Sequence, residues 1–169
     1  ERVLKPKVAL ITDSEDFDTI VAQKGLFHTR VQVFGRKAHG AYNWLGVSAI
    51  EISARIIDRL KKHKFKCRKH PLLVPPTVNI GTIKGGDKVN MVADFCEFSV
   101  DIRYLPDMTA DGVLKQMKEI IEKETKNYKV IIDDSQLPYE IDAKHPFVKT
   151  YVDVAKKMGI KATLKGSQG

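Results

Sequence analysis

Residues 91–104 form a long run in which polar and apolar side chains alternate. The apolar side chains that share one face are Cys96, Phe98, Val100 and Ile102. Alternation with a period of two residues is typical of a strand with one buried face and one solvated face, as in antiparallel sheets. Pro106 ends the run, because proline cannot donate to a strand ladder. The chain is therefore expected to fold around a sheet that is covered on one side.

Further strands and helices are predicted on both sides of this run. The strands are expected over residues 26–34, 77–83 and 128–132. The helices are expected over 46–62, after the N-cap residue Thr109, and from Pro146. The middle of the chain then has the order strand, helix, strand, strand, helix, strand. That order predicts an α+β fold, a ferredoxin-like split β-α-β sandwich in which a four-stranded antiparallel sheet has two helices on one face.

The predicted helix over 46–62 has apolar residues on two arcs. One arc contains Ile50, Ala54, Ile57 and Leu60, and the other contains Ala49, Ile52 and Ile56. Only one arc can face the helix's own sheet. We expect the arc of Ala49, Ile52 and Ile56 to pack against a second copy of the chain in a two-fold contact.

The two ends of the chain predict strands that have no partner in this fold. Residues 8–12 are a short apolar run that predicts a buried strand, and residues 161–164 predict the start of another. We therefore expect both ends to belong to a second, truncated domain. The N-terminus lacks the apolar stretch and cleavage site of a signal peptide. No apolar run approaches the roughly 20 residues that a membrane-spanning helix needs, so no membrane partner is expected.

Charge and cysteine content favour a soluble cytoplasmic protein. The formal net charge is +8, which could indicate nucleic-acid binding. The basic residues are spread along the chain, however, and the one cluster, over 61–69, lies at the C-terminal end of a predicted helix. Cations there interact favourably with the helix dipole. We interpret them as a solvated surface. Cys67 and Cys96 form no Cys-x-x-Cys pair, and a reducing cytoplasm is the default for such usage.

Single residues taken alone do not define a site. None of the five histidines lies in a local metal-binding pattern, and the acidic run over 13–18 lacks the glycine and glutamate of an EF-hand. Taken alone, His39 is most simply a surface histidine, and Arg103 most simply pairs with an acidic neighbour. Gly85-Gly86 alone indicates a turn.

In order, however, these residues resemble one family. The matching segments are Gly35-Arg36-Lys37-Ala38-His39, Gly46-Val47-Ser48-Ala49-Ile50, Gly85-Gly86, Asn90-Met91-Val92-Ala93 and Asp101-Ile102-Arg103, with Lys24-Gly25 before them. They resemble the zinc-dependent exopeptidases and amidohydrolases: acetylornithine deacetylases, succinyl-diaminopimelate desuccinylases, aminoacylases and glutamate carboxypeptidases such as carboxypeptidase G. Ser48 and Ala93 replace the family's usual asparagine and proline, and Asp13-Ser14 replaces the commoner Glu-Pro. The family's His-x-Asp ligands, bridging aspartate and catalytic Glu-Glu pair have no counterpart.

The resemblance implies a domain plan and an activity. Residues 25–137 would be the dimerisation (lid) domain, and residues 1–24 and 138–169 would be parts of a truncated α/β catalytic domain. The full enzyme would cleave the amide bond of N-acyl amino acids or small peptides as a deacetylase, desuccinylase or carboxypeptidase. Two zinc ions, with cobalt or manganese as alternatives, would activate a water and polarise the scissile carbonyl. This chain would not bind them fully and would be inactive alone.

The resemblance also implies roles for single residues. His39 would enter the partner subunit's active site and stabilise the oxyanion. Arg103 would bind a substrate carboxylate, with Asn90 as a further hydrogen-bond donor, and we predict that Gly166 and Ser167 also contact substrate. Asp13 would be a zinc ligand or, if the replacement of Glu-Pro by Asp13-Ser14 changes its role, a residue that supports a ligand. A homodimer would form through the 46–62 helix and its adjacent edge strand.

Two other functions are alternatives to the enzyme. A stand-alone ferredoxin-like nucleic-acid-binding module would account for the charge of +8. An RNA-binding sheet needs aromatic side chains on its open face, whereas Glu97 and Asp101 on that face would repel phosphate. A dimerisation module without a catalytic parent would leave the flanking strands unexplained. We therefore expect no nucleic-acid partner.

Overall fold

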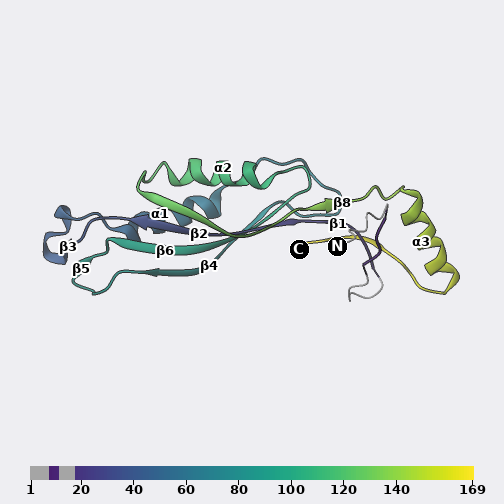
Figure 1. Cartoon of the computed structure of the whole chain (residues 1–169), viewed down its shortest axis with the longest axis horizontal. Helices are drawn as coiled ribbons and strands as arrows, with labels where there is room; N and C mark the ends of the chain where they lie inside the picture. Colours follow the sequence, from purple (N-terminus) through teal and green to yellow (C-terminus); the bar gives the residue numbers. More distant parts are fainter. Residues whose placement is uncertain (1–7, 12–17) are drawn as a thin grey trace, which may run out of the picture.

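The computed structural model describes residues 8–11 and 18–169. Its largest element is a four-stranded antiparallel sheet, the large sheet, which sets the long axis of the molecule (Figure 1). The strands are β2 (Gly25–Phe34), β4 (Thr77–Gly85), β6 (Phe95–Tyr104) and β7 (Tyr128–Gln136), in the spatial order β4-β6-β2-β7. β4 and β7 are therefore its edges.

Helices α1 (Ala49–Lys62) and α2 (Ala110–Ile121) pack on one face of the large sheet. Each begins at a residue whose hydroxyl accepts a backbone N–H: Ser48 accepts from Glu51 at 3.2 Å, and Thr109 accepts from Gly112 at 3.1 Å. The sequence predicted the second start correctly. It placed the first about three residues early, because Val47 is hydrogen-bonded to Arg36 in the preceding loop.

The core lies between the helices and the large sheet. The predicted alternation of β6 is confirmed: its apolar residues Cys96, Phe98, Val100 and Ile102 are buried, and the intervening residues are partly solvated. The same face of β2 is buried, and the Thr29 hydroxyl lies 3.9 Å from the sulfur of Met117 in α2. The opposite, open face has polar pairs such as Gln32 with Glu97 at 2.7 Å.

The assignment of the two arcs of α1 was wrong. Ala49, Ile52 and Ile56 face the protein's own sheet, with Ile56 fully buried, and Leu60 belongs with them. Residues 49, 52, 53, 56 and 60 form one stripe at helical spacing, in which the small Ser53 is also buried. The arc left accessible contains Ile50, Ala54 and Ile57. Ile57 lies on the side of β4, because Lys61, one turn further along α1, donates to the carbonyl of Val78 at 2.8 Å.

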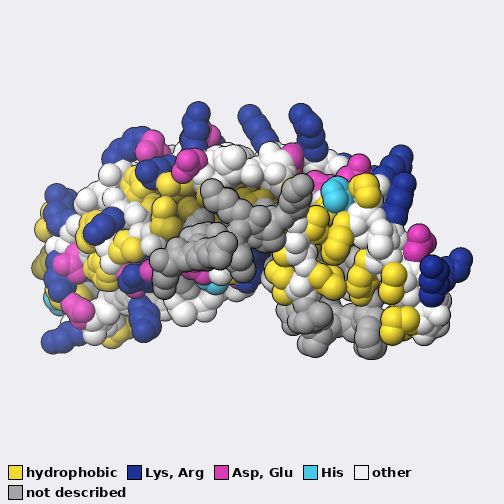
Figure 2. Space-filling view, turned by 45° about the vertical axis from the view of Figure 1, so that its right-hand side comes forward, with side chains coloured by type: hydrophobic (Ala, Val, Ile, Leu, Met, Phe, Trp, Pro, Cys, Tyr) yellow, Lys and Arg dark blue, Asp and Glu magenta, His cyan; other side chains and the backbone are white. Residues whose placement is uncertain are grey.

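A second, three-stranded sheet, the small sheet, lies at the other end of the molecule (Figure 1). It contains β1 (Thr19–Gln23), β8 (Tyr139–Glu140) and β9 (Leu164–Ser167) in the order β8-β1-β9, and α3 (Pro146–Lys157) lies between β8 and β9 in the chain. Its buried cluster contains Ala22, Leu73 and Leu105, and Val21, Val148 and Ala155 are buried outside that cluster. Figure 2 shows apolar side chains gathered on the surface of this lobe, which includes the exposed Val154 and Met158.

The prediction of a buried strand over residues 8–12 was wrong for the part that the structure describes. Val8, Leu10 and Ile11 are exposed, and no described strand lies alongside residues 8–11 to pair with them. An apolar run alone does not fix a strand, because its backbone groups need a partner. Within residues 8–11 and 18–169, no helix is long and apolar enough to cross a membrane.

Candidate functional site

The first group of predicted site residues lies at the tip, the end of the large sheet formed by residues 35–48 and 86–94. Here β3 (Ala38–His39) pairs with β5 (Met91–Val92), and the short helix η1 (Gly40–Leu45) follows β3 directly. Gly46 must be glycine at this close approach, because a Cβ there would lie 2.8 Å from the side chain of Val92. The glycines that gave the motif its pattern thus close the tip into a compact loop.

His39 is exposed at the tip, and its ring orientation is fixed locally. Its Nδ1 atom accepts the backbone N–H of Ala41 at 3.1 Å. In the neutral imidazole the proton is then on Nε2, because an acceptor nitrogen cannot also hold it. His39 therefore presents an Nε2–H donor to the surroundings. The ring of Tyr42 lies 6.2 Å away, between centroids.

Asn90 lies beside His39. Its backbone carbonyl accepts the N–H of Gly40 at 2.7 Å, and His39 is the register partner of Met91. The Asn90 side chain is exposed. The tip therefore offers two donor side chains close together, His39 and Asn90, on a loop held by backbone hydrogen bonds.

Arg103 lies at the opposite end of β6, next to the small sheet. Its Nε donates to one carboxylate oxygen of Asp101 at 2.8 Å, and its Nη2 to the other at 3.3 Å. The expected pairing with an acidic neighbour is therefore confirmed. It occupies one edge of the guanidinium, and the Nη1 atom faces the end of the chain, where a Cβ on Gly169 would lie 2.9 Å from it.

Gly166 and Ser167 are at this same end. The Ser167 carbonyl accepts the N–H of Lys24 at 3.2 Å, and its hydroxyl accepts the N–H of Gly169 at 3.2 Å. Gly166 lies against the connection between α1 and β4, and a Cβ there would be 2.7 Å from the carbonyl oxygen of Leu72. The structure therefore brings Arg103, Gly166 and Ser167 together, and separates them from His39 and Asn90.

The two groups are far apart within one chain. Arg103 is eight residues along β6 from Phe95, whose preceding residue, Asp94, accepts the N–H of Gly35 at the tip. A strand rises about 3.3 Å per residue, so Arg103 lies about 26 Å from Phe95 along β6. A small amide substrate cannot span that distance.

Lys24 is a further residue at the Arg103 end, and the sequence had used it only as a family landmark. It is 2% exposed, and its ammonium donates to the carbonyl of Pro75 at 2.9 Å. Burial, and then the positive charge of Arg103, lower the pKa of Lys24. A buried lysine without a carboxylate beside it is costly. The adjacent Gly25, packed against the Tyr104 ring, is the only sequence signal at this position.

The described residues do not supply a metal site. No group of three or more His, Cys, Asp or Glu side chains in residues 8–11 and 18–169 is arranged to hold a metal ion. Asp13, the predicted ligand, lies outside the described residues. The described residues therefore do not fit the zinc ions that the resemblance implies.

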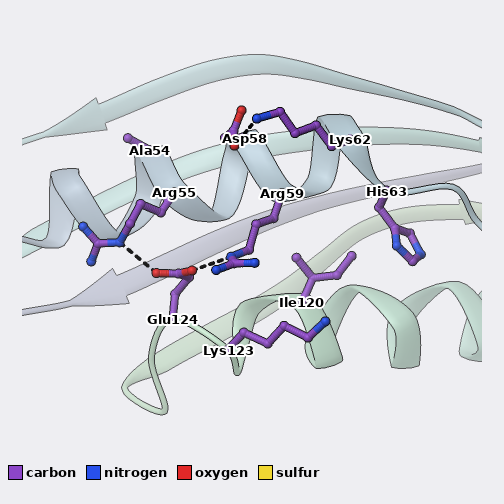
Figure 3. Close-up of a pocket in the computed structure, with 9 residues that line it drawn as sticks. All are labelled: Ala54, Arg55, Asp58, Arg59, Lys62, His63, Ile120, Lys123 and Glu124. Atoms are coloured by element: carbon purple, nitrogen blue, oxygen red, sulfur yellow. Dashed lines mark hydrogen bonds and ion pairs between the residues drawn. The ribbon is translucent and has the colours of Figure 1, made fainter.

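A groove between α1 and α2 is separate from both groups. It has a volume of about 730 Å³, and nine residues line it: Ala54, Arg55, Asp58, Arg59, Lys62, His63, Ile120, Lys123 and Glu124 (Figure 3). None of them was predicted as a site residue.

Comparison with known proteins agrees with the motifs. The sequence profile of the peptidase dimerisation domain matches residues 21–129. Acetylornithine deacetylase from Vibrio campbellii is 31% identical over 154 residues, which cover 85% of this chain and 41% of that protein. The Vibrio cholerae acetylornithine deacetylase is 29% identical over 163 residues, covering 90% and 43%.

Solved structures show the same arrangement. The aminopeptidase PepT from Bacillus cereus superposes with a TM-score of 0.77 at 25% identity, over 95% of this chain and 42% of PepT. A tripeptidase from Staphylococcus aureus gives a TM-score of 0.73 at 22% identity, over 94% and 42%, and shows the fold alone. This chain spans about two fifths of the length of these relatives. Because the profile covers most of its length, the chain belongs to the peptidase dimerisation domain family of the zinc exopeptidases and amidohydrolases.

Proposed function

We propose that this chain is the dimerisation and substrate-binding part of a metal-dependent amidohydrolase that cleaves the amide bond of N-acyl amino acids or small peptides. Residues 25–137 form the dimerisation (lid) domain, and residues 1–24 and 138–169 belong to the catalytic domain. The names of the deacetylase and peptidase relatives support the reaction class. The element order and the strand order β4-β6-β2-β7 support a ferredoxin-like split β-α-β arrangement for the lid.

One observation supports the proposal most directly: His39 and Arg103 lie at opposite ends of one sheet. About 26 Å separates Arg103 from Phe95, the residue of β6 that borders the tip. Two groups that act on one small substrate must lie within its length. Two copies of the chain, related by a two-fold axis, can bring the His39 of one copy to the Arg103 of the other.

His39 stabilises the oxyanion in this arrangement. The backbone N–H of Ala41 holds the ring in the tautomer that has its proton on Nε2, so a donor is already oriented before substrate binds. Asn90, on the neighbouring strand of the tip, supplies a second donor. Neither residue needs to bind metal for this role.

Arg103 binds the carboxylate of the substrate. Asp101 holds one edge of the guanidinium, which leaves Nη1 and the outer hydrogen of Nη2 for a bidentate contact. Gly166 and Ser167 border the same space and complete the contact with the carboxylate. Asp101 therefore positions Arg103, and a carboxylate ligand accepts hydrogen bonds from the guanidinium N–H groups that Asp101 leaves free.

The homodimer forms through α1 and the edge strand β4. Ile50 and Ile57 of the accessible arc lie on the side of β4, and Ile50 is 39% exposed. β4 has an unpaired outer edge, and such an edge favours pairing with another strand. The metal ligands come from outside the described residues.

A complementation experiment tests the proposal. His39→Ala is made in the enzyme that contains this chain and is mixed with a subunit whose own catalytic glutamate is replaced. If His39 acts in the partner's active site, the mixed dimer regains one working site from two inactive parents. Zinc content measured by atomic absorption should be unchanged in His39→Ala. No recovery of turnover in a verified heterodimer would show that His39 acts within its own subunit.

The alternative of a nucleic-acid-binding module is not favoured. The open face of the large sheet carries carboxylates, including Glu97 and Asp101, and these pair with neighbouring basic side chains. The family match is to a peptidase domain.

A further inference from the structure

The groove between α1 and α2 is bordered by the cationic flank of α1, which contains Arg55, Arg59 and Lys62 (Figure 3). These residues recur at helical spacing on the side of α1 away from the accessible apolar arc. The two flanks therefore differ in chemistry: Ile50 and Ile57 lie on the side of β4, whereas the cationic flank faces α2, with Ala54 at the border of the groove. A dimer formed through Ile50, Ile57 and β4 would leave the cationic flank open.

One carboxylate orders two of the cations. Glu124, just after α2, accepts from the Nε of Arg55 at 2.8 Å and from the Nε of Arg59. Its side chain is only 8% exposed, whereas those of Arg55 and Arg59 are 53% and 50% exposed. Hydrogen bonds from these arginines lower the pKa of Glu124, which keeps its negative charge near neutral pH.

Glu124 contacts only the Nε edge of each guanidinium. In the part of the chain that the structure describes, the terminal Nη atoms of Arg55 and Arg59 have no protein acceptor. An arginine whose Nε is fixed presents its Nη donors in a defined direction, so less side-chain freedom is lost when an anion binds. These donors are therefore available to a ligand from solution.

Two lysines add charge to the groove. Lys62 pairs with Asp58 at 2.8 Å, and the ammonium of Lys123 has no acceptor within residues 8–11 and 18–169. In Figure 3, the guanidinium of Arg59 points towards Glu124, and Lys123 extends below Ile120. Four permanently cationic side chains thus face two carboxylates, Asp58 and Glu124, which leaves two positive charges uncompensated.

We propose that this groove is a binding site for a phosphate group that carries at least two negative charges, as in inorganic phosphate, diphosphate or a small phosphate monoester. Arginine forks match the oxygens of phosphate in geometry, and a dianion balances the two uncompensated charges. A monocarboxylate would balance only one of them. Arg59 and Lys123 are the main ligands, Arg55 and Lys62 add long-range attraction, and Glu124 positions the two arginines.

Isothermal titration calorimetry with inorganic diphosphate tests the site, at constant ionic strength set with sodium chloride. The chain should bind one diphosphate saturably. Orthophosphate and glycerol 3-phosphate, used as competitors, distinguish an inorganic ligand from a monoester, and competition by either supports the site. If no saturable binding is measured at constant ionic strength, the proposal is overturned. Nonspecific electrostatic attraction, which salt screens, would then account for any heat released by phosphate.

Three variants locate the site. Lys123→Gln removes a charge that has no protein partner among the described residues, so the fold is preserved, and it should weaken diphosphate binding about tenfold, as expected for one charge-assisted hydrogen bond. Arg59→Ala should weaken it at least as much, with folding checked by circular dichroism. Lys149→Gln, an exposed lysine of α3, is the matched control and should bind like the unchanged protein. Equal affinities of Lys123→Gln and Lys149→Gln would refute this location.

Discussion

The large sheet and the small sheet differ in how much apolar surface they bury. The large sheet and its two helices enclose a continuous core that includes Phe98, Ile56 and Met117, none of them accessible to solvent. The small sheet has the cluster of Ala22, Leu73 and Leu105, and many apolar side chains of that lobe are exposed. Since apolar burial is the dominant favourable term in folding, the stability of this chain comes mainly from the large sheet.

The largest expected difference is between core substitutions in the two regions. Phe98→Ala should lower the free energy of unfolding by about 3–5 kcal/mol, because it removes a fully buried ring. Leu73→Ala should cost about 2 kcal/mol, at the low end for such changes, because its small cluster can collapse around the gap. Urea denaturation measures both, and the 84% exposed Leu137→Ala is a near-neutral control. Equal costs at Phe98 and Leu73 would show one core rather than two.

The two arcs of α1 give the next difference. Ile56→Ala should destabilise the large sheet by about 2–5 kcal/mol, since Ile56 is fully buried. Ile50→Ala should change stability by less than about 1 kcal/mol but should weaken self-association, which sedimentation equilibrium measures. If Ile50→Ala leaves the association constant unchanged, the accessible arc is not the dimer surface.

Arg103 lies where the large sheet meets the small one, and its replacement should affect substrate rather than stability. In the full enzyme, Arg103→Ala should lower kcat/KM for carboxylate substrates by about 1.5–3 kcal/mol in transition-state binding, and much less for the corresponding amides. Asp101→Ala should produce a smaller loss in the same direction, mainly in KM, because Arg103 loses its orientation. Equal losses for acid and amide would identify the Arg103–Asp101 pair as structural.

The smallest predicted effect is a pH dependence confined to the large sheet. Burial, and then the hydrogen bond to Glu122 at 2.9 Å, raise the pKa of Tyr128 to about 12. The folded state then holds this proton more tightly than the unfolded state, whose tyrosine titrates near 10. The stability contributed by Tyr128 is therefore present below about pH 10 and is lost as the pH rises to about 12. Tyr128→Phe should show a shallower decline in denaturation midpoint over this window, and parallel profiles would contradict the assignment.

The elements predicted best from the sequence are those long enough for their periodicity to repeat several times. The ten-residue strand β6 alternates clearly and ends at Tyr104 as predicted, although the single strand predicted over 91–104 is divided into β5 and β6. α2 has apolar residues at helical spacing and starts after its predicted N-cap, Thr109. Two-residue strands such as β3 and β8 have no measurable period and were missed. In α1 the pattern showed two apolar arcs but could not show which one faced the sheet, because Leu60 could be grouped with either.

The candidate site was predicted by residue type and order, and its spatial division was not. The motif gave His39 and Arg103 as one set, yet the structure places them at opposite ends of β6. The Asp101–Arg103 pair could be expected from their spacing, since residues two apart share a face of a strand. The shielding of Glu124 between two arginines depends on how α1 packs against α2, which no local pattern reports.

Because the tip is far from the connection between the two sheets, a small rotation at that connection would displace the tip strongly. β1 passes into β2 through Lys24 alone, and β7 passes into β8 through Leu137 and Pro138, so a short two-stranded ribbon joins the sheets, beside which Lys24 also contacts Pro75 and Gly166 lies against Leu72. His39 lies about 26 Å or more from this ribbon. A rotation of about 10° between the sheets would displace the tip by about 4–5 Å, more than the length of a hydrogen bond. A small change of angle between the sheets would therefore be enough to move the Nε2–H donor of His39 into or out of hydrogen-bond reach of a bound group.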